Sequence, residues 1–263
     1  MRRPNLIVSS GVTMNNEICP ICKTNTIELL DVVDFNKYCT HEEIIEYELS
    51  GIPIYYSNCK SCDFTYAKDI YLWTHDDFKK KIYNDEYIKY DQDYVEVRPQ
   101  QSSKFLFDFF GTNLKNANHL DYGGGSGRLV EIMNQNGVSS VNYEPFSSDS
   151  VIPNEQFDLI TAFEVLEHVP NPVELFDKID KLLSNPGIFL FGTQVSDGWI
   201  TKGKRLDWWY ASPRNGHISL FSRRSLSLLA EKYGFYFASF DSGLHLFTRK
   251  IPIWANHRLS VPT

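Results

Sequence analysis

The sequence predicts an α/β protein in which a doubly wound sheet follows a small cysteine-rich module. Residues 118–133 are typical of a short strand, a glycine turn and an amphipathic helix, the first βα unit of such a sheet. Four of the five cysteines form two Cys-x-x-Cys pairs near the N-terminus. We therefore expect a metal-binding module over residues 1–75, in which 1–13 are a loose extension, a helical lid or linker over 76–115, and the sheet domain over 116–263.

Length and charge exclude several classes of protein. The 263 residues suffice for one large α/β domain with a small appendage and a core that needs no disulfides. An excess of 33 acidic over 26 basic side chains argues against nucleic acid as the main partner. No apolar run approaches the ~18 residues that span a bilayer, and the N-terminal apolar stub is too short for a secretory signal. We expect a cytoplasmic protein that binds neither nucleic acid nor membrane; the oligomeric state is left open.

The paired cysteines, Cys19 with Cys22 and Cys59 with Cys62, have the spacing of a structural zinc site. A two-residue gap lets both thiolates of a pair face one tetrahedral ion at about 2.3 Å, and four thiolates leave no open position for catalysis. The alternating run 52–56 predicts a strand leading into the second pair. Two surface disulfides are disfavoured in a reducing compartment, and a thioredoxin-like redox site needs only one pair, at the head of a helix.

The segment after residue 75 is charged and rich in tyrosine. Its tyrosines recur at spacings of four, three and four, which predicts one helical face: Tyr83, Tyr87, Tyr90 and Tyr94. Such a stripe serves either packing or a lid over a site, and we take Tyr83 and Tyr87 as candidate substrate contacts. After Pro99 the sequence predicts a helix capped by Ser102 or Ser103 that ends near Gly111.

The glycine turn is the most informative motif. A strand ending at Asp121 runs into Gly-Gly-Gly-Ser-Gly, but the dinucleotide fingerprint would need a further glycine where Arg128 stands. An acid at the strand end disfavours a pyrophosphate and suits a cationic ligand, which can lie against glycines that lack Cβ atoms. A second acid, Glu144, ends the next strand. A carboxylate at that place accepts hydrogen bonds from ribose hydroxyls, whether the ribose belongs to a dinucleotide or to a cationic cofactor, so Glu144 does not distinguish the two.

The order of motifs carries a family resemblance. DYGGGSGRLVEIM, the acid of VNYEP, FDLITAFEVLEHVPNPVELF and NPGIFLFGT together resemble the class I S-adenosylmethionine-dependent methyltransferases. GHISLFSRRSLSLLAEKYGF is similar to the segment before the closing hairpin in the small-molecule branch of that superfamily. The resemblance implies a Rossmann-like, seven-stranded-type sheet with an antiparallel closing hairpin. Only 13 residues separate Glu144 from Asp158, so the region between the second and fourth strands is shortened, with room for a turn and a short strand such as 150–152.

The resemblance implies an enzyme that uses S-adenosyl-L-methionine and releases S-adenosylhomocysteine. The cysteine module resembles those of methyltransferases from sugar, surface-polysaccharide (capsule) and natural-product pathways. We therefore expect O-methylation of a small polar acceptor: a sugar, a sugar nucleotide or a phosphate-containing metabolite. The alternatives are N- or C-methylation of a related molecule, an NAD-dependent oxidoreductase and a non-catalytic zinc-ribbon binding protein.

The resemblance also assigns cofactor residues in this sequence. Asp121 would hold the methionine ammonium, the Gly123 and Gly125 backbone would cradle the ligand, and Glu144 would bind the ribose. The remaining candidates line the adenine and methionine parts: Phe146, Ala162 and Phe163.

Candidates for catalysis and substrate contact follow the fourth and fifth strands. An imidazole suits proton removal at neutral pH. We favour His217 as general base and take His168 mainly as an organising residue and second catalytic candidate. The long segment after residue 193 is rich in aromatic side chains and cations that suit an anionic or polyhydroxylated acceptor. Its candidates for substrate contact are Trp208, Trp209, Tyr210 and Arg214.

Overall fold

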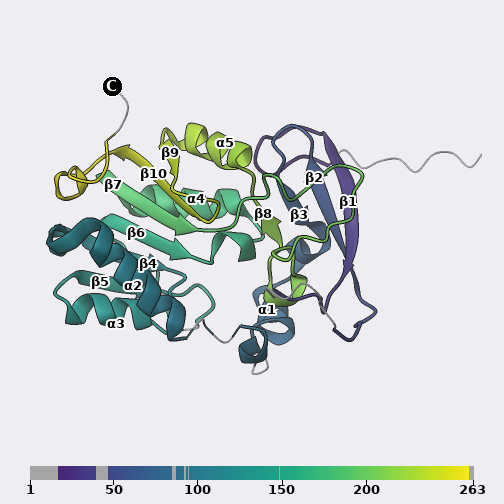
Figure 1. Cartoon of the computed structure of the whole chain (residues 1–263), viewed down its shortest axis with the longest axis horizontal. Coiled ribbons are helices and arrows are strands. Elements are labelled where there is room, and N and C mark those ends of the chain that lie inside the picture. The colour runs from purple at the N-terminus through teal and green to yellow at the C-terminus, as the bar shows by residue number, and fades with distance from the viewer. Residues whose placement is uncertain are drawn as a thin grey trace, which may run out of the picture.

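The computed structural model describes residues 17–39, 47–84, 87–91, 93, 95–147 and 149–260. The expected loose extension, residues 1–13, lies outside them. Two sheets stand side by side, a large one with helices on both faces and a smaller one formed mainly by the N-terminal segment (Figure 1). Among the described helices, none combines the length and the apolar character needed to cross a membrane.

The large sheet has six strands in the described residues, in the order β5-β4-β6-β7-β10-β9. The first four are parallel, and β10 runs antiparallel between β7 and β9 as the closing hairpin. The bounds are β4 Asn118–Tyr122, β5 Ser139–Tyr143, β6 Phe157–Phe163, β7 Leu183–Gly192, β9 Tyr236–Ser239 and β10 Leu244–Lys250. The parallel α/β sheet and its hairpin are therefore as expected.

The predicted seven-stranded type of sheet is not what the described residues form. Between β5 and β6 they contain neither a helix nor a strand, and the short strand expected at 150–152 is absent there. That expectation was wrong because the segment lies on the surface: the side chain of Val151 is 82% exposed, with no neighbouring strand to pair with it.

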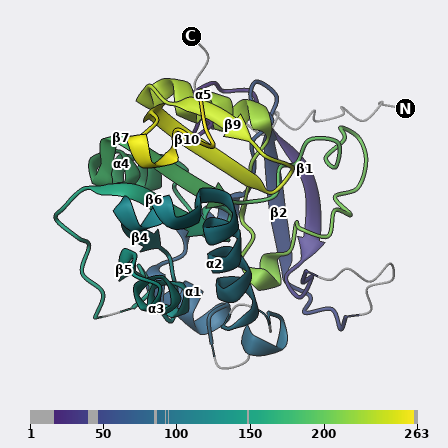
Figure 2. The ribbon, with the colours of Figure 1, turned by 60° about the vertical axis from the view of Figure 1, so that its left-hand side comes forward.

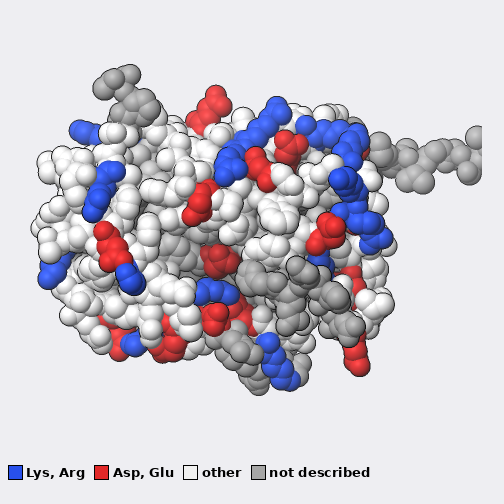
Figure 3. Space-filling model, in the orientation of Figure 1, with Lys and Arg blue, Asp and Glu red and all other residues white. Residues whose placement is uncertain are grey.

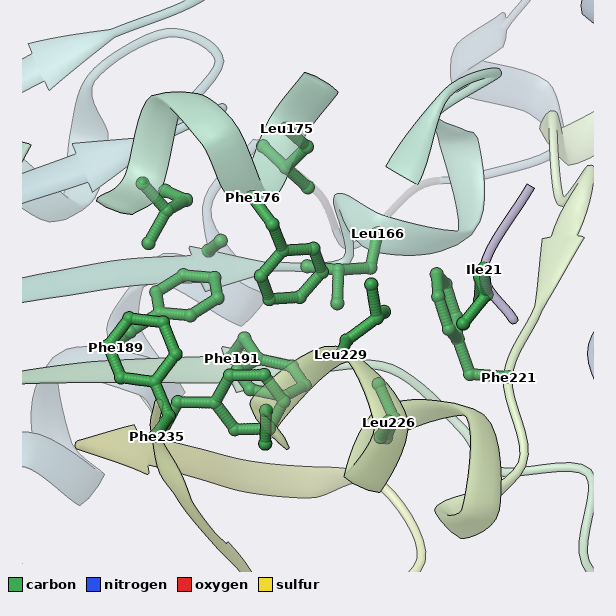
Figure 4. Packing of buried hydrophobic residues seen from close by; sticks show 14 of the residues in the cluster. Ile21, Leu166, Leu175, Phe176, Phe189, Phe191, Phe221, Leu226, Leu229 and Phe235 are labelled. Atoms are coloured by element: carbon green, nitrogen blue, oxygen red, sulfur yellow. The ribbon is translucent and has the colours of Figure 1, made fainter. Parts of the chain in front are cut away.

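Helices cover both faces of the large sheet (Figure 2). On one face, α2 (Val97–Phe110) and α3 (Arg128–Gln135) pack against it through Leu106, Phe110 and Met133. On the other, α4 (Pro172–Leu182) and α5 (Arg223–Tyr233) bury Phe176, Leu226 and Leu229 against Phe189 and Phe191 (Figure 4). Alternation along β6 sends Leu159 to the first core and Ile160 to the second, so both faces of the strand are buried.

The smaller sheet combines distant parts of the chain. It contains β1 (Ile27–Asp34), β2 (Pro53–Cys59), β3 (Thr65–Ala67) and β8 (Ser219–Leu220) in that order, all antiparallel. The strand predicted at 52–56 is thus confirmed as part of β2. Strand β8 follows β7 in the chain, so a segment that comes after the parallel strands of the large sheet completes the small, N-terminal sheet.

The tyrosine-rich segment is not one helix. It comprises α1 (His75–Lys81) and a 3-10 turn, η2 (Tyr87–Lys89), before α2 begins. The single helical face predicted for the tyrosines is therefore wrong; Tyr94 lies outside the described residues. Helix α2 starts at Val97, earlier than expected, because Pro99 occupies the first turn, where its missing N–H costs no hydrogen bond. Its end at Phe110, followed by Gly111, is as predicted.

Short 3-10 turns complete the fold: η1 Lys68–Leu72, η3 Gly111–Asn116, η4 Leu166–His168, η5 Pro213–Asn215 and η6 Ile253–Ala255. Two of them matter for function. Turn η4 follows β6 directly, and η5 leads into β8, so both lie where the two sheets meet.

Candidate active site

A cavity of about 790 Å³ lies at the carboxyl ends of β4, β5 and β6, where ligands bind in open α/β sheets. The glycine turn forms one part of its wall and the first turns of α2 another. Tyrosines preceding α2, the end of η4 and the first turns of α4 (Pro172–Leu182) form further parts of the wall. The glycine turn, the acid after β5 and the residues after β6 thus share one cavity.

Two positions of the glycine turn, Gly123 and Gly124, have no room for a side chain. A Cβ on Gly124 would lie 2.2 Å from Asn142 Oδ1 and 2.4 Å from Asp121 Oδ2, and one on Gly123 would lie 2.6 Å from Val165 Cγ2. Gly125, with φ +54°, has nothing within 4 Å of such a position. A ligand can therefore approach the backbone here as closely as van der Waals contact allows.

Asp121 lies at the base of this turn and is only 4% exposed. One carboxylate oxygen accepts a 2.7 Å hydrogen bond from Thr161 Oγ1. Burial, reinforced by the nearby charge of Glu144, raises the pKa of Asp121 to about 6. A cationic ligand group beside it would stabilise the ionised form.

Asn142 was not singled out from the sequence. It pairs in register with Asp121 across β4 and β5, and its Nδ2 donates to the Gly125 carbonyl at 3.3 Å. Its Oδ1 is buried without a hydrogen-bond partner in the described part of the chain. Asn142 does not itself line the cavity; its oxygen lies against Gly124, which does, and such an orphaned acceptor suits a donor group. The sequence offered one signal for Asn142: it is a polar residue two positions before Glu144, and residues two apart in a strand point to the same face.

Glu144 ties the glycine turn to the segment after β5. Its Oε2 accepts a 2.9 Å hydrogen bond from the Gly125 N–H, and its Oε1 accepts one of 2.9 Å from the Phe146 N–H. Phe146 lines the cavity and stacks on His75, with ring centroids 4.6 Å apart. Of the two residues expected at the end of β6, Phe163 lines the cavity, whereas Ala162 is fully buried in the core behind it.

The chain turns sharply after β6. Glu164 has φ +54°, a left-handed conformation that is uncommon for residues other than glycine. Glu164 lines the cavity, and burial raises the pKa of its carboxyl. Three residues later, Glu167 is fully buried, and neither of its carboxylate oxygens makes a hydrogen bond of ordinary geometry with a described residue.

His168 and His217 lie together beside Glu167, with ring centroids 5.0 Å apart. Only His168 lines the cavity; His217 is buried behind it. Burial lowers the pKa of His168 to about 4 and that of His217 well below its usual range, so both imidazoles are neutral at pH 7.

The backbone determines which nitrogen of each ring carries the proton. Nδ1 of His168 lies 3.1 Å from the Gly216 carbonyl, and Nδ1 of His217 lies 2.8 Å from the Tyr210 carbonyl. Since a carbonyl can only accept, each Nδ1 donates, and each Nε2 carries a lone pair.

The other predicted substrate contacts divide into two groups. Tyr83 and Tyr87 line the cavity. The ion pair of Arg98 and Asp91 lines it too: Arg98 Nη2 donates to Asp91 Oδ1 at 2.5 Å and Nη1 to Oδ2 at 3.1 Å. The aromatic and basic residues of the later segment do not line it: Trp208, Trp209, Tyr210 and Arg214. They pack instead against the small sheet, because β8 draws this segment into its core. Arg214 lies over the Tyr90 ring at 4.0 Å and donates to the Lys81 and Ile82 carbonyls.

The four paired cysteines come together at the end of the small sheet. The Sγ atoms of Cys19 and Cys62 are 3.6 Å apart, and those of Cys22 and Cys59 are 3.5 Å apart. All four Sγ atoms lie within 4.8 Å of one another. Ile21 and Phe221 connect this cluster with the core of the large sheet (Figure 4).

Known proteins resemble the chain as follows. A family model described as a methyltransferase domain matches residues 94–239. A ubiquinone biosynthesis O-methyltransferase from Actinobacillus pleuropneumoniae is 34% identical over 65 residues, which span 22% of this chain and 27% of that protein.

Two solved structures from Burkholderia thailandensis are similar. An O-methyltransferase family protein has a TM-score of 0.45 at 12% identity, covering 59% of this chain and 58% of its own. A 1,6-didemethyltoxoflavin-N1-methyltransferase with bound S-adenosylhomocysteine has a TM-score of 0.45 at 17% identity, covering 68% and 87%.

The cavity fits the cofactor of this family. The backbone at Gly125 borders open space that a ligand can fill, and the buried Asp121 carboxylate suits a cationic group. The Asn142 oxygen next to Gly124 lacks a donor. The family model covers more than half of the chain, which sets aside the nicotinamide enzyme and the non-catalytic binding protein. The chain belongs to the methyltransferase-domain family.

Proposed function

We propose that this enzyme transfers a methyl group to a hydroxyl oxygen of a small polar acceptor, such as a sugar, a sugar nucleotide or a phosphate-containing metabolite. The observation that carries the proposal is His168, a neutral imidazole that lines the same cavity as the glycine turn. An acceptor hydroxyl becomes nucleophilic only as its proton leaves, so it needs a basic or polarising group beside it. The partial relative named an O-methyltransferase agrees with this choice of atom.

The cofactor is assigned to the glycine-turn side of the cavity. Asp121 holds the methionine ammonium, the Gly123 and Gly125 backbone cradles the ligand, and Glu144 accepts from the ribose hydroxyls. Phe146 covers the adenine, and Phe163 lines the methionine part. This assignment is supported by the shared cavity wall. When bound, S-adenosylmethionine supplies a methyl group on a positively charged sulfur.

The histidine pair is assigned to the acceptor. His168 faces the acceptor hydroxyl, and His217 positions His168 from behind. This reverses the roles that the sequence favoured for the two histidines, because only His168 lines the cavity. The pair is neutral and presents a lone pair on each Nε2, which suits a hydroxyl.

Glu164 is the proposed proton acceptor. Glu164 lines the cavity, and burial raises the pKa of its carboxyl, which makes it a better base than an exposed carboxylate. The acceptor O–H bond breaks and its proton goes to Glu164 while the oxygen bonds to the methyl carbon. The carbon–sulfur bond breaks, and sulfur keeps the electron pair. The protein contributes alignment and exclusion of water.

The acceptor side of the cavity favours a polyhydroxylated molecule. Tyr83, Tyr87 and Phe105 offer aromatic faces for a sugar ring, and the paired Asp91 and Arg98 offer an acceptor and donors for its hydroxyls. Surface-polysaccharide (capsule) or natural-product biosynthesis is the proposed setting. Acidic and basic side chains are interspersed on the face seen in Figure 3, in keeping with a small molecule rather than nucleic acid as partner.

The test uses the full chain, methyl-labelled cofactor and a panel of sugar nucleotides and polar metabolites. We expect the label on an acceptor oxygen, identified by NMR of the product. Label on nitrogen or carbon would establish one of the alternative acceptor atoms and overturn the proposal. His168→Ala should lower kcat by about 10² to 10⁴ while the affinity for S-adenosylhomocysteine stays within about twofold. An unchanged kcat would remove His168 from the mechanism.

We further propose that the four-cysteine cluster binds one structural zinc ion. Four sulfurs at about 2.3 Å from a tetrahedral ion are about 3.8 Å apart, close to the 3.5 and 3.6 Å of the two short Sγ pairs. Thiolates at all four positions leave no site for water, so the ion stabilises the small sheet and takes no part in methyl transfer.

A further inference from the structure

The carboxylate of Glu167 and the two histidine rings form a second cluster of potential metal ligands, separate from the cysteines. One ligand atom from each of Glu167, His168 and His217 lies within 4.8 Å of the others. Nε2 of His168 is 3.9 Å from Glu167 Oε1. This spacing is wide enough to surround a cation and too long for direct hydrogen bonds among the three groups.

With Glu167 ionised, the three side chains offer only acceptors to one another. Each imidazole uses its Nδ1 proton on a backbone carbonyl, of Gly216 or Tyr210, and keeps a lone pair on Nε2. A histidine ligand to a metal typically donates its other N–H in this way, which fixes its tautomer and orientation. The cluster therefore has the hydrogen-bond arrangement of a ligand set.

Glu167 supplies the independent evidence for a ligand. Its side chain is 0% exposed, and neither oxygen makes a hydrogen bond of ordinary geometry with a described residue, although the hydroxyls of Tyr210 and Thr193 lie near enough to lower its pKa. Leaving a buried carboxylate uncompensated is costly, so such a group either takes up a proton or binds a cation.

We propose that Glu167, His168 and His217 bind one divalent first-row transition-metal ion. Two imidazoles and one carboxylate suit such ions better than Mg²⁺ or Ca²⁺, which prefer oxygen ligands throughout. Three protein ligands leave positions open for water or substrate. Because His168 lines the cavity, the open positions face the acceptor.

The backbone around the ligands is held rigidly by the small sheet. The Tyr56 hydroxyl donates to the His217 carbonyl at 2.6 Å, and the Ile218 N–H donates to the Glu167 carbonyl at 2.8 Å. The Ala67 N–H in turn donates to the Ile218 carbonyl at 2.8 Å. Preorganised ligands of this kind lower the entropic cost of binding an ion.

The role of the ion rests on the proposed function, whereas its binding does not. A cation beside the acceptor oxygen lowers the pKa of the hydroxyl and so assists its loss of a proton to Glu164. With the ion bound, His168 and His217 act on the acceptor through it, because their Nε2 lone pairs are then its ligands.

The test counts ions on the full chain with its cysteine cluster intact. The protein is titrated with Mn²⁺ and, separately, with Co²⁺; bound Mn²⁺ is measured by loss of the free-ion electron paramagnetic resonance signal and Co²⁺ by its visible absorption. Both ions bind more weakly than Zn²⁺ to a given site, so neither displaces zinc from the thiolates. We expect one equivalent of at least one of the two ions per chain. Failure of both to bind to the wild-type protein overturns the proposal without any variant.

Variants then locate the ion. Glu167→Gln and His217→Gln should each weaken its binding by about 100-fold or more. The matched controls are Glu155→Gln and His257→Gln, exposed side chains away from the cavity, which should bind it as the wild type does. Retention of S-adenosylhomocysteine binding shows that a variant is folded. An ion retained by folded Glu167→Gln and His217→Gln lies elsewhere, and the assignment fails.

The two proposals fail in different ways. If the ion binds as expected but the methyl group is found on nitrogen or carbon, the metal site stands and the O-methyltransferase proposal falls. If the methyl group is found on oxygen, but neither Mn²⁺ nor Co²⁺ binds to the protein or changes the rate, the metal-site proposal is wrong and the O-methyltransferase proposal stands.

Discussion

The hydroxyl of Tyr56 in strand β2 donates a 2.6 Å hydrogen bond to the backbone carbonyl of His217, 161 residues further along the chain. Both residues are buried where the two sheets meet. The bond joins the module that carries the cysteines to the histidine behind His168. The N-terminal module is therefore part of the wall that supports the active site.

Replacing Tyr56 with Phe should disturb catalysis more than cofactor binding. Losing a buried hydroxyl that serves a backbone carbonyl costs about 1–2 kcal/mol of unfolding free energy. We expect a lower methyl-transfer rate, because His217 and with it His168 lose a restraint, and an unchanged dissociation constant for S-adenosylhomocysteine. The control is Tyr55→Phe, since Tyr55 is 41% exposed on the opposite face of the strand. A wild-type rate in Tyr56→Phe would show that this contact serves stability alone.

Removing one cysteine should release the metal and weaken the whole chain. Purified protein is expected to contain about one zinc per chain by elemental analysis, and Cys59→Ser to contain none. Strand β8 and the bond from Ser222 Oγ to the Cys62 carbonyl, 2.7 Å long, couple the module to the large sheet. The melting temperature of the entire protein should fall with the metal. Cys39→Ser should keep its zinc, because Cys39 lies against Ser212, outside the cluster. Wild-type protein devoid of zinc in reducing buffer would refute the proposal.

Truncating Glu144 should weaken cofactor binding. The carboxylate is assigned to the ribose and also accepts from the Gly125 and Phe146 N–H groups, so Glu144→Ala removes a ligand contact and loosens the turn. We expect a loss of about 1.5–3 kcal/mol, the scale for hydrogen bonds to a charged group, measured by calorimetric titration with S-adenosylhomocysteine. Glu155→Ala, an exposed glutamate, is the control. Equal affinities in the two variants would contradict the ribose assignment.

Cofactor affinity should depend on pH through Asp121. Its folded-state pKa is raised to about 6, and the ionised form is the one that attracts an ammonium group. Affinity for S-adenosylhomocysteine should therefore fall as the pH drops through about 6, while Asp121→Asn should bind more weakly with a flat profile over that range. Stability has the opposite sign: the raised pKa stabilises the fold fully below about 3.8, and this contribution is lost as the pH rises through 6. Identical pH profiles for the wild type and the variant would exclude Asp121 from the cationic end of the ligand.

Local patterns were sufficient for much of the architecture. The strand at 157–163, the glycine turn and the helix after it follow from periodicity and from residues with special backbone freedom, which act over a few positions. The two cysteine pairs could be assigned to one cluster because ligand spacing within each pair is itself local. The single helix predicted for the tyrosine segment was wrong. Its residue spacing fits a helix, but the segment lies between the two sheets, and packing against them determines its structure.

Only the tertiary structure decided which distant side chains meet. The pairing of Ser219 and Leu220 with β3 pulls Trp208 and Tyr210 into the small sheet's core and places His217 behind His168. No periodicity within either segment specifies that pairing, because it depends on burial gained jointly by parts of the chain about 150 residues apart. Sequence alone therefore determined the family's motifs and the glycine-turn end of the cavity, and long-range strand pairing determined the chemistry at its other end.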